Sequence, residues 1–376
     1  GNYRVSLNAK DGKERWRMQI ADVYKDFFSS IAPLIIGNHV IVAPGNNDDI
    51  RAYLESRDPE TGALQWRWFV DPKPGEPGSE TWVDAETMAK GGGFPWLNGT
   101  YDPKLNLYYF GTGNGVPMHR PPHPTPNGDS LYTACIVALN PDTGKMAWAF
   151  QATPHDTHDY DAAQTPILFD AEFKGKQRKL LAQVSRNGYF FLLDRATGEH
   201  LLTTKYMPET NWAMGIDKAG RPIPDPKKDA NPPGTLVSPY AIGATNWWPP
   251  SYDPKRGLIF VNAAHTWSYF TTSGYGRFRF PPQYVVNAID YRTGKVVWTH
   301  DLGDQSGVLI SGLLSTAGDL VFTGDSVGNF LALDPESGKT LWHVKLQEFI
   351  TNAPMTYRLD GRQYVLVAAN DTLYAF

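Results

Sequence analysis

The chain has 376 residues and a net charge of −4, with 35 lysines and arginines against 39 aspartates and glutamates. No cluster of basic residues appears, so nucleic acid is not expected as a partner. No apolar run approaches the roughly 20 residues that cross a bilayer, so no membrane span is expected. The 12 tryptophans, 19 tyrosines, 35 glycines and 30 prolines favour short strands and frequent turns over long helices.

One pattern recurs along the chain: Asp or Asn, three residues, Gly, three residues, Trp. Five full copies begin at Asn8, Asp58, Asn140, Asp290 and Asp334. A further copy at Asp194 has Leu202 in place of Trp. Asp or Asn bonds the turn backbone and Gly accepts a positive φ angle, so each copy predicts a β-hairpin with a bulge-type glycine. The Trp falls on the returning strand, where it can pack against the next repeat.

The spacing of the copies predicts a β-propeller. Neighbouring copies start 44 to 96 residues apart. A four-stranded blade takes about 40–50 residues, so the longer intervals leave room for an insertion or an unmarked blade. We therefore expect an all-β chain with about seven blades' worth of sequence, organised as a single propeller domain over residues 1–376.

Segments between the repeats carry aromatic and polar residues in glycine-rich or proline-containing frames. In chain order they are 91–96 (GGGFPW), 111–117 (GTGNGVP), 151–161 (QATPHDTHDYD), 185–188 (SRNG) and 243–247 (GATNW). Each has a structural interpretation beside a functional one. Trp96 suits an inter-blade contact, Gly-Asn-Gly suits a tight turn, and the acidic run suits a solvated loop. Arg186 and Asn246 could simply satisfy the backbone of buried turns.

The repeat resembles the tryptophan-docking motif of the PQQ-dependent (quinoprotein) alcohol and methanol dehydrogenases, and the likeness is collinear along essentially the whole chain. The resemblance implies an eight-bladed propeller. The stretch from Gly1 to Trp16 is similar to one well inside the family's propeller, so we expect this propeller to lack the family's N-terminal segment. The chain begins at Gly1 without a signal peptide, and the resemblance alone implies a periplasmic location.

The same resemblance assigns residues that bind the cofactor PQQ. Segment 91–96 is similar to the one whose tryptophan stacks on the quinone, so Trp96 is expected as the floor of the site; a flat indole suits a flat cofactor. Arg186 matches the arginine that approaches the quinone oxygens, where it would stabilise developing negative charge. Asn246 and Trp247 are expected as further cofactor contacts.

The resemblance also implies a catalytic base and a metal site. Asp159 matches the family's base, and Asn114 matches an asparagine that binds the metal ion, a hard cation that takes oxygen ligands. Asp161 resembles the pattern of lanthanide-using members, so Ca²⁺ or a lanthanide is expected and Asp161 favours the lanthanide. In an extended strand Asp159 and Asp161 would point to the same side and converge. A family glutamate ligand is replaced by Asn47, with Asp48 as the substitute if the loop shifts by one residue.

These assignments imply PQQ-dependent oxidation of a small alcohol to an aldehyde or ketone, with hydride transfer to the quinone, metal assistance and Asp159 as base. Cys135 is the only cysteine, lies in an apolar run and predicts a buried thiol; this chain thus has no CxxCH haem motif. Electrons are therefore expected to leave to a separate acceptor such as cytochrome c. The altered glutamate loop and the missing segment favour an alternative: a non-catalytic propeller scaffold or binding protein, or an inactive fragment of such an enzyme.

Overall fold

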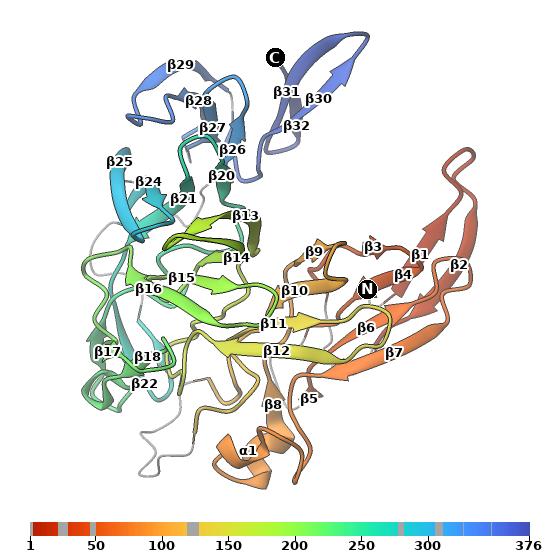
Figure 1. Cartoon of the computed structure of the whole chain (residues 1–376), viewed down its shortest axis with the longest axis vertical. Helices are drawn as coiled ribbons and strands as arrows, with labels where there is room; N and C mark the ends of the chain where they lie inside the picture. Colours follow the sequence, from red (N-terminus) through yellow and green to blue (C-terminus); the bar gives the residue numbers. More distant parts are fainter. Residues whose placement is uncertain are drawn as a thin grey trace.

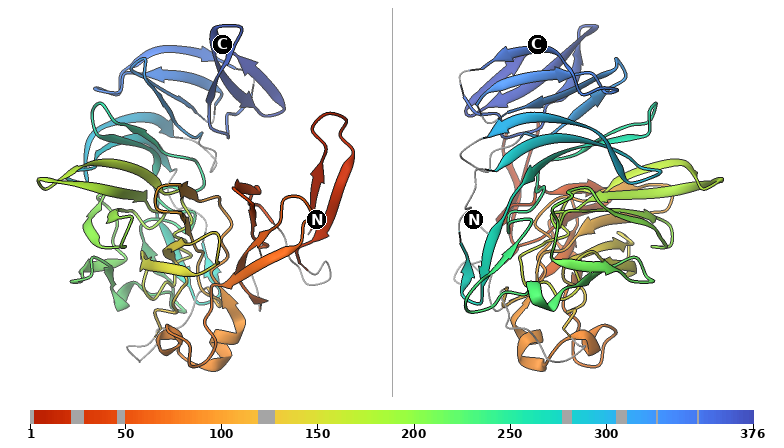
Figure 2. Two further views of the ribbon diagram at one scale, coloured as in Figure 1. Left: turned by 45° about the vertical axis from the view of Figure 1, so that its right-hand side comes forward. Right: turned by 90° about the vertical axis from the view of Figure 1, so that its left-hand side faces the viewer.

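The structure is a computed structural model, and it describes residues 3–21, 29–45, 50–118, 128–276, 282–304, 311–325, 327–346 and 348–376. Short antiparallel sheets follow one another in chain order and fan out around a common centre (Figure 1 and Figure 2). Within these residues the helical segments are α1 (Ala85–Lys90), η1 (Ser79–Thr81) and η2 (Pro226–Lys228). The prediction of an all-β chain is confirmed.

Five sheets in the described residues have four strands, and each is a blade of consecutive antiparallel hairpins. Their strands, blade by blade, are β3 (Leu34–Ile36), β4 (His39–Val42), β6 (Tyr53–Arg57) and β7 (Leu64–Phe69); β9 (Thr100–Asp102), β10 (Leu107–Gly111), β11 (Cys135–Leu139) and β12 (Met146–Gln151); β13 (Ile167–Phe173), β14 (Lys176–Val184), β15 (Tyr189–Asp194) and β16 (His200–Lys205); β20 (Ser251–Asp253), β21 (Leu258–His265), β24 (Gln283–Asp290) and β25 (Lys295–Asp304); β26 (Leu314–Thr316), β27 (Leu320–Gly324), β28 (Asn329–Leu333) and β29 (Thr340–Lys345).

Smaller sheets precede, follow and decorate these blades. A two-stranded sheet comes first and a three-stranded sheet comes last, and three short sheets lie in the connections. Their strands are β1 (Tyr3–Leu7) and β2 (Glu14–Gln19); β30 (Met355–Leu359), β31 (Arg362–Ala369) and β32 (Thr372–Ala375); β5 (Ile50–Arg51) and β8 (Gly91–Gly92); β17 (Ala213–Ile216) and β18 (Pro222–Pro224); β19 (Thr235–Val237), β22 (Ser268–Thr271) and β23 (Gly274–Tyr275). The number of blades in a complete ring stays a prediction.

The repeated turns have the predicted hairpin geometry. In all six copies the glycine has φ between 65° and 77°, and its N–H donates to the Asp or Asn carbonyl at 2.7–2.9 Å. The side chain of that Asp or Asn accepts a second backbone N–H two residues further on. A register shift precedes each turn, which is the mark of the β-bulge. The prediction of hairpins with bulge-type glycines is confirmed.

Tryptophans of the repeat bind their own blade to the turn of the next blade by a hydrogen bond and by ring packing. The indole Nε1 donates to a backbone carbonyl in the next blade's turn in four pairs: Trp16 to Pro59 (2.9 Å), Trp66 to Pro141 (2.6 Å), Trp148 to Arg195 (3.1 Å) and Trp298 to Pro335 (3.0 Å). The indole ring covers the turn glycine, because a Cβ atom on Gly144 would lie 2.7 Å from Cδ2 of Trp66. Glycine in these turns therefore provides both the positive φ and the space for the partner ring.

The degenerate copy and the last copy differ from this arrangement. Where Leu202 replaces Trp, the Thr204 hydroxyl takes over the contact and donates to the Gly294 carbonyl at 2.8 Å. In the last copy Trp342 is 42% exposed, and its ring packs at 5.5 Å from Phe376. A shared repeat in the sequence thus yields unequal packing in the fold.

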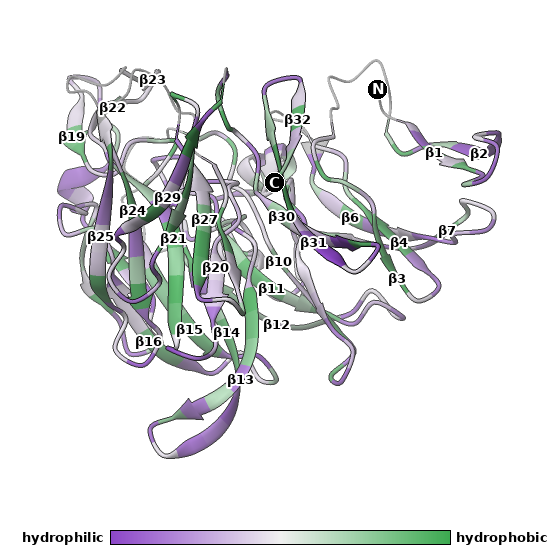
Figure 3. Ribbon diagram, turned by 90° about the horizontal axis from the view of Figure 1, so that it is seen from above, coloured by the Kyte–Doolittle hydropathy of each residue, from purple (hydrophilic) through white to green (hydrophobic). Residues whose placement is uncertain are grey.

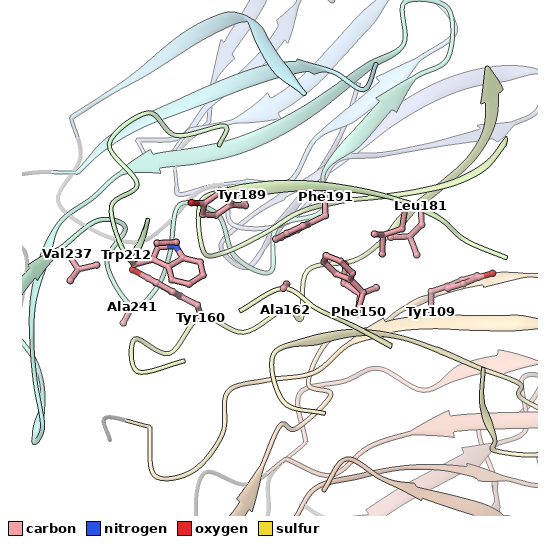
Figure 4. Close-up of a cluster of buried hydrophobic side chains, with 14 of the residues drawn as sticks. Tyr109, Phe150, Tyr160, Ala162, Leu181, Tyr189, Phe191, Trp212, Val237 and Ala241 are labelled. Carbon is pink, nitrogen blue, oxygen red and sulfur yellow. The ribbon is translucent and has the colours of Figure 1, made fainter. Parts of the chain in front are cut away.

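Buried aromatic side chains fill the space between blades. One cluster joins residues of two blades with residues of the connections, among them Tyr109, Phe150, Tyr160, Phe191 and Trp212 (Figure 4). Hydrophobic residues concentrate in the middle strands, whereas the hairpin after β13 is hydrophilic (Figure 3). Cys135 has no exposed surface, and burial raises the pKa of its thiol, so its prediction as a structural thiol agrees with its position. No helix among the described residues is long and apolar enough to cross a membrane.

Candidate active site

A cavity of about 420 Å³ gathers residues from separate blades, and this volume lies in the range of small-molecule sites. Five of the predicted site residues line it: Trp96, Asn114, Asp159, Asp161 and Arg186. They come from four of the segments that the sequence analysis singled out, which lie up to 90 residues apart in the chain. The fold thus brings together most of the residues that the sequence predicted as one site.

Glycines let the backbone segments of this cavity pack closely. Residues 50–51 pair in parallel with Gly91 and Gly92, and Gly92 bridges to Gly115. A Cβ atom on Gly92 would lie 2.7 Å from the backbone N of Val116, and the φ of Gly92 is 115°. No other residue type adopts this conformation at that distance without strain, so the GGG run brings the Trp96 segment against the Asn114 loop.

One arginine bridges the two predicted aspartates. Arg186 donates from Nη2 to Asp159 Oδ2 at 2.9 Å and from Nη1 to Asp161 Oδ2 at 2.6 Å. The strand interpretation of this segment was wrong, because residues 155–163 contain no strand and Asp159 has a left-handed φ of 68°. The carboxylates converge nevertheless, because the turned backbone aims both at the same guanidinium.

Arg186 is itself anchored from several sides. Its Nε donates to the carbonyl of Ala241 at 2.6 Å, and its backbone N–H donates to Oε1 of Gln164 at 3.0 Å. The side chain is 6% exposed. A buried guanidinium held by two carboxylates and a carbonyl has little freedom to rotate, so it presents a fixed positive charge to the cavity.

Asp159 lies in an environment that disfavours its negative charge. Burial raises the pKa of Asp159 well above its usual range; the neighbouring Arg186 opposes this shift, and Asp161 and Asp156 add to it. Burial also raises the pKa of Asp156 to about 6, although its two oxygens accept the backbone N–H groups of His158 at 2.9 Å and Tyr160 at 2.7 Å. Asp156 thereby fixes the turn that carries Asp159.

Two other predicted cofactor contacts, Asn246 and Trp247, are not among the residues that line the cavity. Trp247 packs edge-on against Trp96 with ring centroids 6.5 Å apart, so it supports the indole. The Nδ2 of Asn246 donates to the carbonyl of Ile242 at 2.6 Å, and its buried Oδ1 has no partner in the described residues. The predicted ligand Asn47 and its substitute Asp48 lie outside the described residues.

The cavity also has lining residues to which the sequence analysis assigned no role, although five of them lie in the segments 91–96 and 111–117 that it singled out. They are Ser30, Gly45, Gly92, Gly93, Phe94, Gly113, Val116 and Met118. Ser30 belongs to no recognisable motif, so the sequence carried no signal for it. Its hydroxyl donates to the carbonyl of Trp96 at 2.9 Å. Gly45 directly precedes the loop that contains Asn47, which is the signal by which it could have been found.

The donor set fits a hard cation and a planar anionic cofactor. Asp159, Asp161 and Asn114 offer carboxylate and amide oxygens on one cavity, and the Asn114 Nδ2 donates to the Gly115 carbonyl at 2.9 Å, which leaves the amide oxygen as its ligand atom. Within the described part of the chain no cluster of three or more His, Cys, Asp or Glu residues forms a metal centre. The indole of Trp96 and the guanidinium of Arg186 supply a stacking surface and a positive charge.

Tryptophan-docked blades around a cavity with an indole, an arginine and paired carboxylates define a β-propeller of the quinoprotein type. The chain matches the family model described as "PQQ: Glucose/ethanol/alcohol dehydrogenase, beta-propeller domain" over residues 20–230 and 270–365. The chain belongs to this family.

Named relatives agree with this assignment. The chain is 34% identical to the quinohemoprotein alcohol dehydrogenase ADH IIB of Pseudomonas putida over 97% of its own length and 57% of that protein. It is 33% identical to a lanthanide-dependent methanol dehydrogenase of Methylorubrum extorquens over 96% of its own length and 67% of that protein. The crystal structure of the quinohemoprotein alcohol dehydrogenase of Comamonas testosteroni superposes with a TM-score of 0.88 at 32% identity, covering 98% of this chain and 60% of that one. The chain therefore spans a little over half the length of several relatives.

Proposed function

We propose that this chain carries the catalytic site of a PQQ-dependent alcohol dehydrogenase, which oxidises a small alcohol to an aldehyde or ketone. The observation that carries the proposal is the convergence of Trp96, Asp159 and Arg186 on one cavity of about 420 Å³. A scaffold has no need of a buried arginine between two buried carboxylates beside an open cavity. The altered glutamate loop is the one sequence feature that favours a non-catalytic propeller, and neither the described residues nor the comparisons add support to that alternative.

The residues have separable roles in this reaction. Trp96 offers the face on which the planar cofactor rests, and Arg186 holds positive charge where electrons arrive. Asp159 accepts the hydroxyl proton of the alcohol at Oδ1, because Oδ2 is engaged by Arg186 at 2.9 Å. PQQ, when bound, supplies the acceptor for the hydride that leaves the alcohol carbon. Proton and hydride together account for the two hydrogens lost when an alcohol becomes a carbonyl compound.

A metal ion would be held by Asp159, Asp161 and Asn114, with Asn47 or Asp48 as a further ligand. The ion would act as a Lewis acid beside the cofactor. Similarity to a lanthanide-dependent methanol dehydrogenase supports a lanthanide, as does the presence of Asp161. Calcium remains the other candidate.

The electron acceptor and the location are further parts of the proposal. We propose that electrons pass from this cavity to a haem-bearing carrier of the cytochrome c type, which the similarity to quinohemoprotein alcohol dehydrogenases supports. A periplasmic location agrees with this partner.

Reconstitution tests the proposal. The chain is mixed with PQQ and either Ca²⁺ or a lanthanide, and dye-linked oxidation of short alcohols is measured. We expect turnover that requires both the quinone and the metal ion and that is lost in Asp159→Asn, with the quinone still bound. Full turnover by Asp159→Asn would remove Asp159 as the base, and the absence of turnover with either metal would contradict the proposed activity.

A further inference from the structure

Asp161 makes more contacts than a metal ligand requires. Its Oδ2 accepts hydrogen bonds from the indole Nε1 of Trp96 at 2.8 Å and from Nη1 of Arg186 at 2.6 Å. Its Oδ1 accepts the backbone N–H of Asn114 at 2.6 Å. One carboxylate thus joins the aromatic surface, the cationic side chain and the Asn114 loop of the cavity.

The surroundings of Asp161 are built to receive this carboxylate. A Cβ atom on Gly113 would lie 3.1 Å from Asp161 Oδ1, so glycine leaves the room that the carboxylate occupies. The side chain of Asp161 is 6% exposed. Gly113 is fixed in turn, because its N–H donates to the Phe94 carbonyl at 3.2 Å and its own carbonyl accepts from Ala134 at 2.7 Å.

The orientation of the indole depends on this carboxylate. Trp96 has its edge against Trp247 at 6.5 Å, a contact that allows the ring to slide or tilt. The hydrogen bond from Nε1 to Asp161 Oδ2 is directional and charge-assisted, and it selects one tilt of the ring. Loss of the carboxylate would leave the ring plane set only by apolar packing.

We propose that Asp161 is a positioning residue, which holds the Trp96 indole and the Arg186 guanidinium in the orientation that they present to the quinone whether or not a metal ion is bound. The inference rests on the proposed function, because it concerns the same cavity. A carboxylate has about four lone-pair positions, and three donors use three of them, so Asp161 keeps about one for a cation.

The first test uses the protein without quinone or metal. In ¹⁵N-indole NMR spectra, the Trp96 signal is assigned by its disappearance in Trp96→Phe. We expect this indole proton to exchange slowly in the native chain, and to shift and exchange faster in Asp161→Ala. Asp161→Asn, which keeps one acceptor oxygen, should give an intermediate signal and guards against a general folding defect. An unchanged Trp96 signal in Asp161→Ala would overturn the proposal.

The second test measures quinone affinity in the presence of a chelator, which removes any contribution from metal ligation. We expect Asp161→Ala to weaken PQQ binding about tenfold, as loss of a charge-assisted hydrogen bond does. Its effect should shrink in the Trp96→Phe background, because part of it acts through the indole N–H. Equal PQQ affinity for the native chain and Asp161→Ala under these conditions would reduce Asp161 to a metal ligand and contradict the inference. If the native chain binds PQQ neither with the chelator nor with Ca²⁺ or a lanthanide present, the proposed function fails, and the NMR result still decides whether Asp161 positions Trp96.

Discussion

The tryptophan docks between blades predict how one methyl group changes stability. In the substitution Gly144→Ala, the new Cβ would lie 2.7 Å from Cδ2 of the Trp66 indole, which covers this glycine from the preceding blade. The φ of Gly144 is 68°, so alanine is also strained there. Gly175 is a matched control, because its φ is 77° and a Cβ atom there would meet nothing within 4 Å.

The two substitutions differ by the cost of displacing the indole. A positive φ costs alanine about 1–2 kcal/mol at either position. At Gly144 the indole must also move, which sacrifices the 2.6 Å hydrogen bond from Trp66 Nε1 to the Pro141 carbonyl, about 1 kcal/mol. Strain of a packed interface adds about 1–3 kcal/mol. We therefore expect Gly144→Ala to lose about 3–6 kcal/mol and Gly175→Ala about 1–2 kcal/mol.

Urea denaturation followed by tryptophan fluorescence measures both losses, and circular dichroism shows whether the blades unfold together. The native chain and the two variants are compared at one pH and one temperature. Equal losses for Gly144→Ala and Gly175→Ala would refute the docking argument, because only the backbone term would then operate.

Two buried ionisable side chains, Asp71 and Arg195, give further predictions. Burial raises the pKa of Asp71 to about 8, both its oxygens lack hydrogen-bond partners in the described residues, and Arg51 Nε lies 4.0 Å away. The native carboxyl binds its proton more tightly than the unfolded one, so the free energy of unfolding should fall as pH rises from about 4 to about 8, by about 5 kcal/mol in all. Urea titrations over this pH range should show the slope in the native chain and not in Asp71→Asn. An identical slope in the variant would contradict the prediction. Arg195 pairs with Asp102 at 2.7 Å and Asp170 at 2.6 Å, so Arg195→Met should lower the free energy of unfolding by about 3–5 kcal/mol, and a neutral result would show that these pairs contribute little.

The turns and the all-β class could be predicted from the sequence because they are local. The Asp-x3-Gly spacing fixes a hairpin whose hydrogen bonds lie within six residues, from the Asp58 N–H to the Ala63 carbonyl at 2.8 Å for example. The partner of each tryptophan could also be anticipated, since a repeat must pack on its neighbour. The role of Thr204 in place of Leu202 could not, because it depends on which side chain of β16 reaches the next turn.

The sequence predicted most residues of the candidate site, but it did not predict the hydrogen bonds between them. The identities of Asp159 and Asp161 followed from a motif, but their convergence was attributed to an extended strand that does not exist. Arg186 lies 25 residues after Asp161 in the chain, and no local pattern shows that its guanidinium bridges both carboxylates. Contacts of this kind depend on how whole blades pack, so they become visible only in the folded chain.

The most direct test of the account is the binding of PQQ to this cavity. Calorimetric titration in the presence of Ca²⁺ or a lanthanide should give one quinone per chain, and Trp96→Leu should weaken binding by about 10- to 100-fold, the usual contribution of stacking on an aromatic side chain. Binding that is unchanged in Trp96→Leu, or no binding to the native chain with either metal, would contradict the assignment of this cavity as the quinone site.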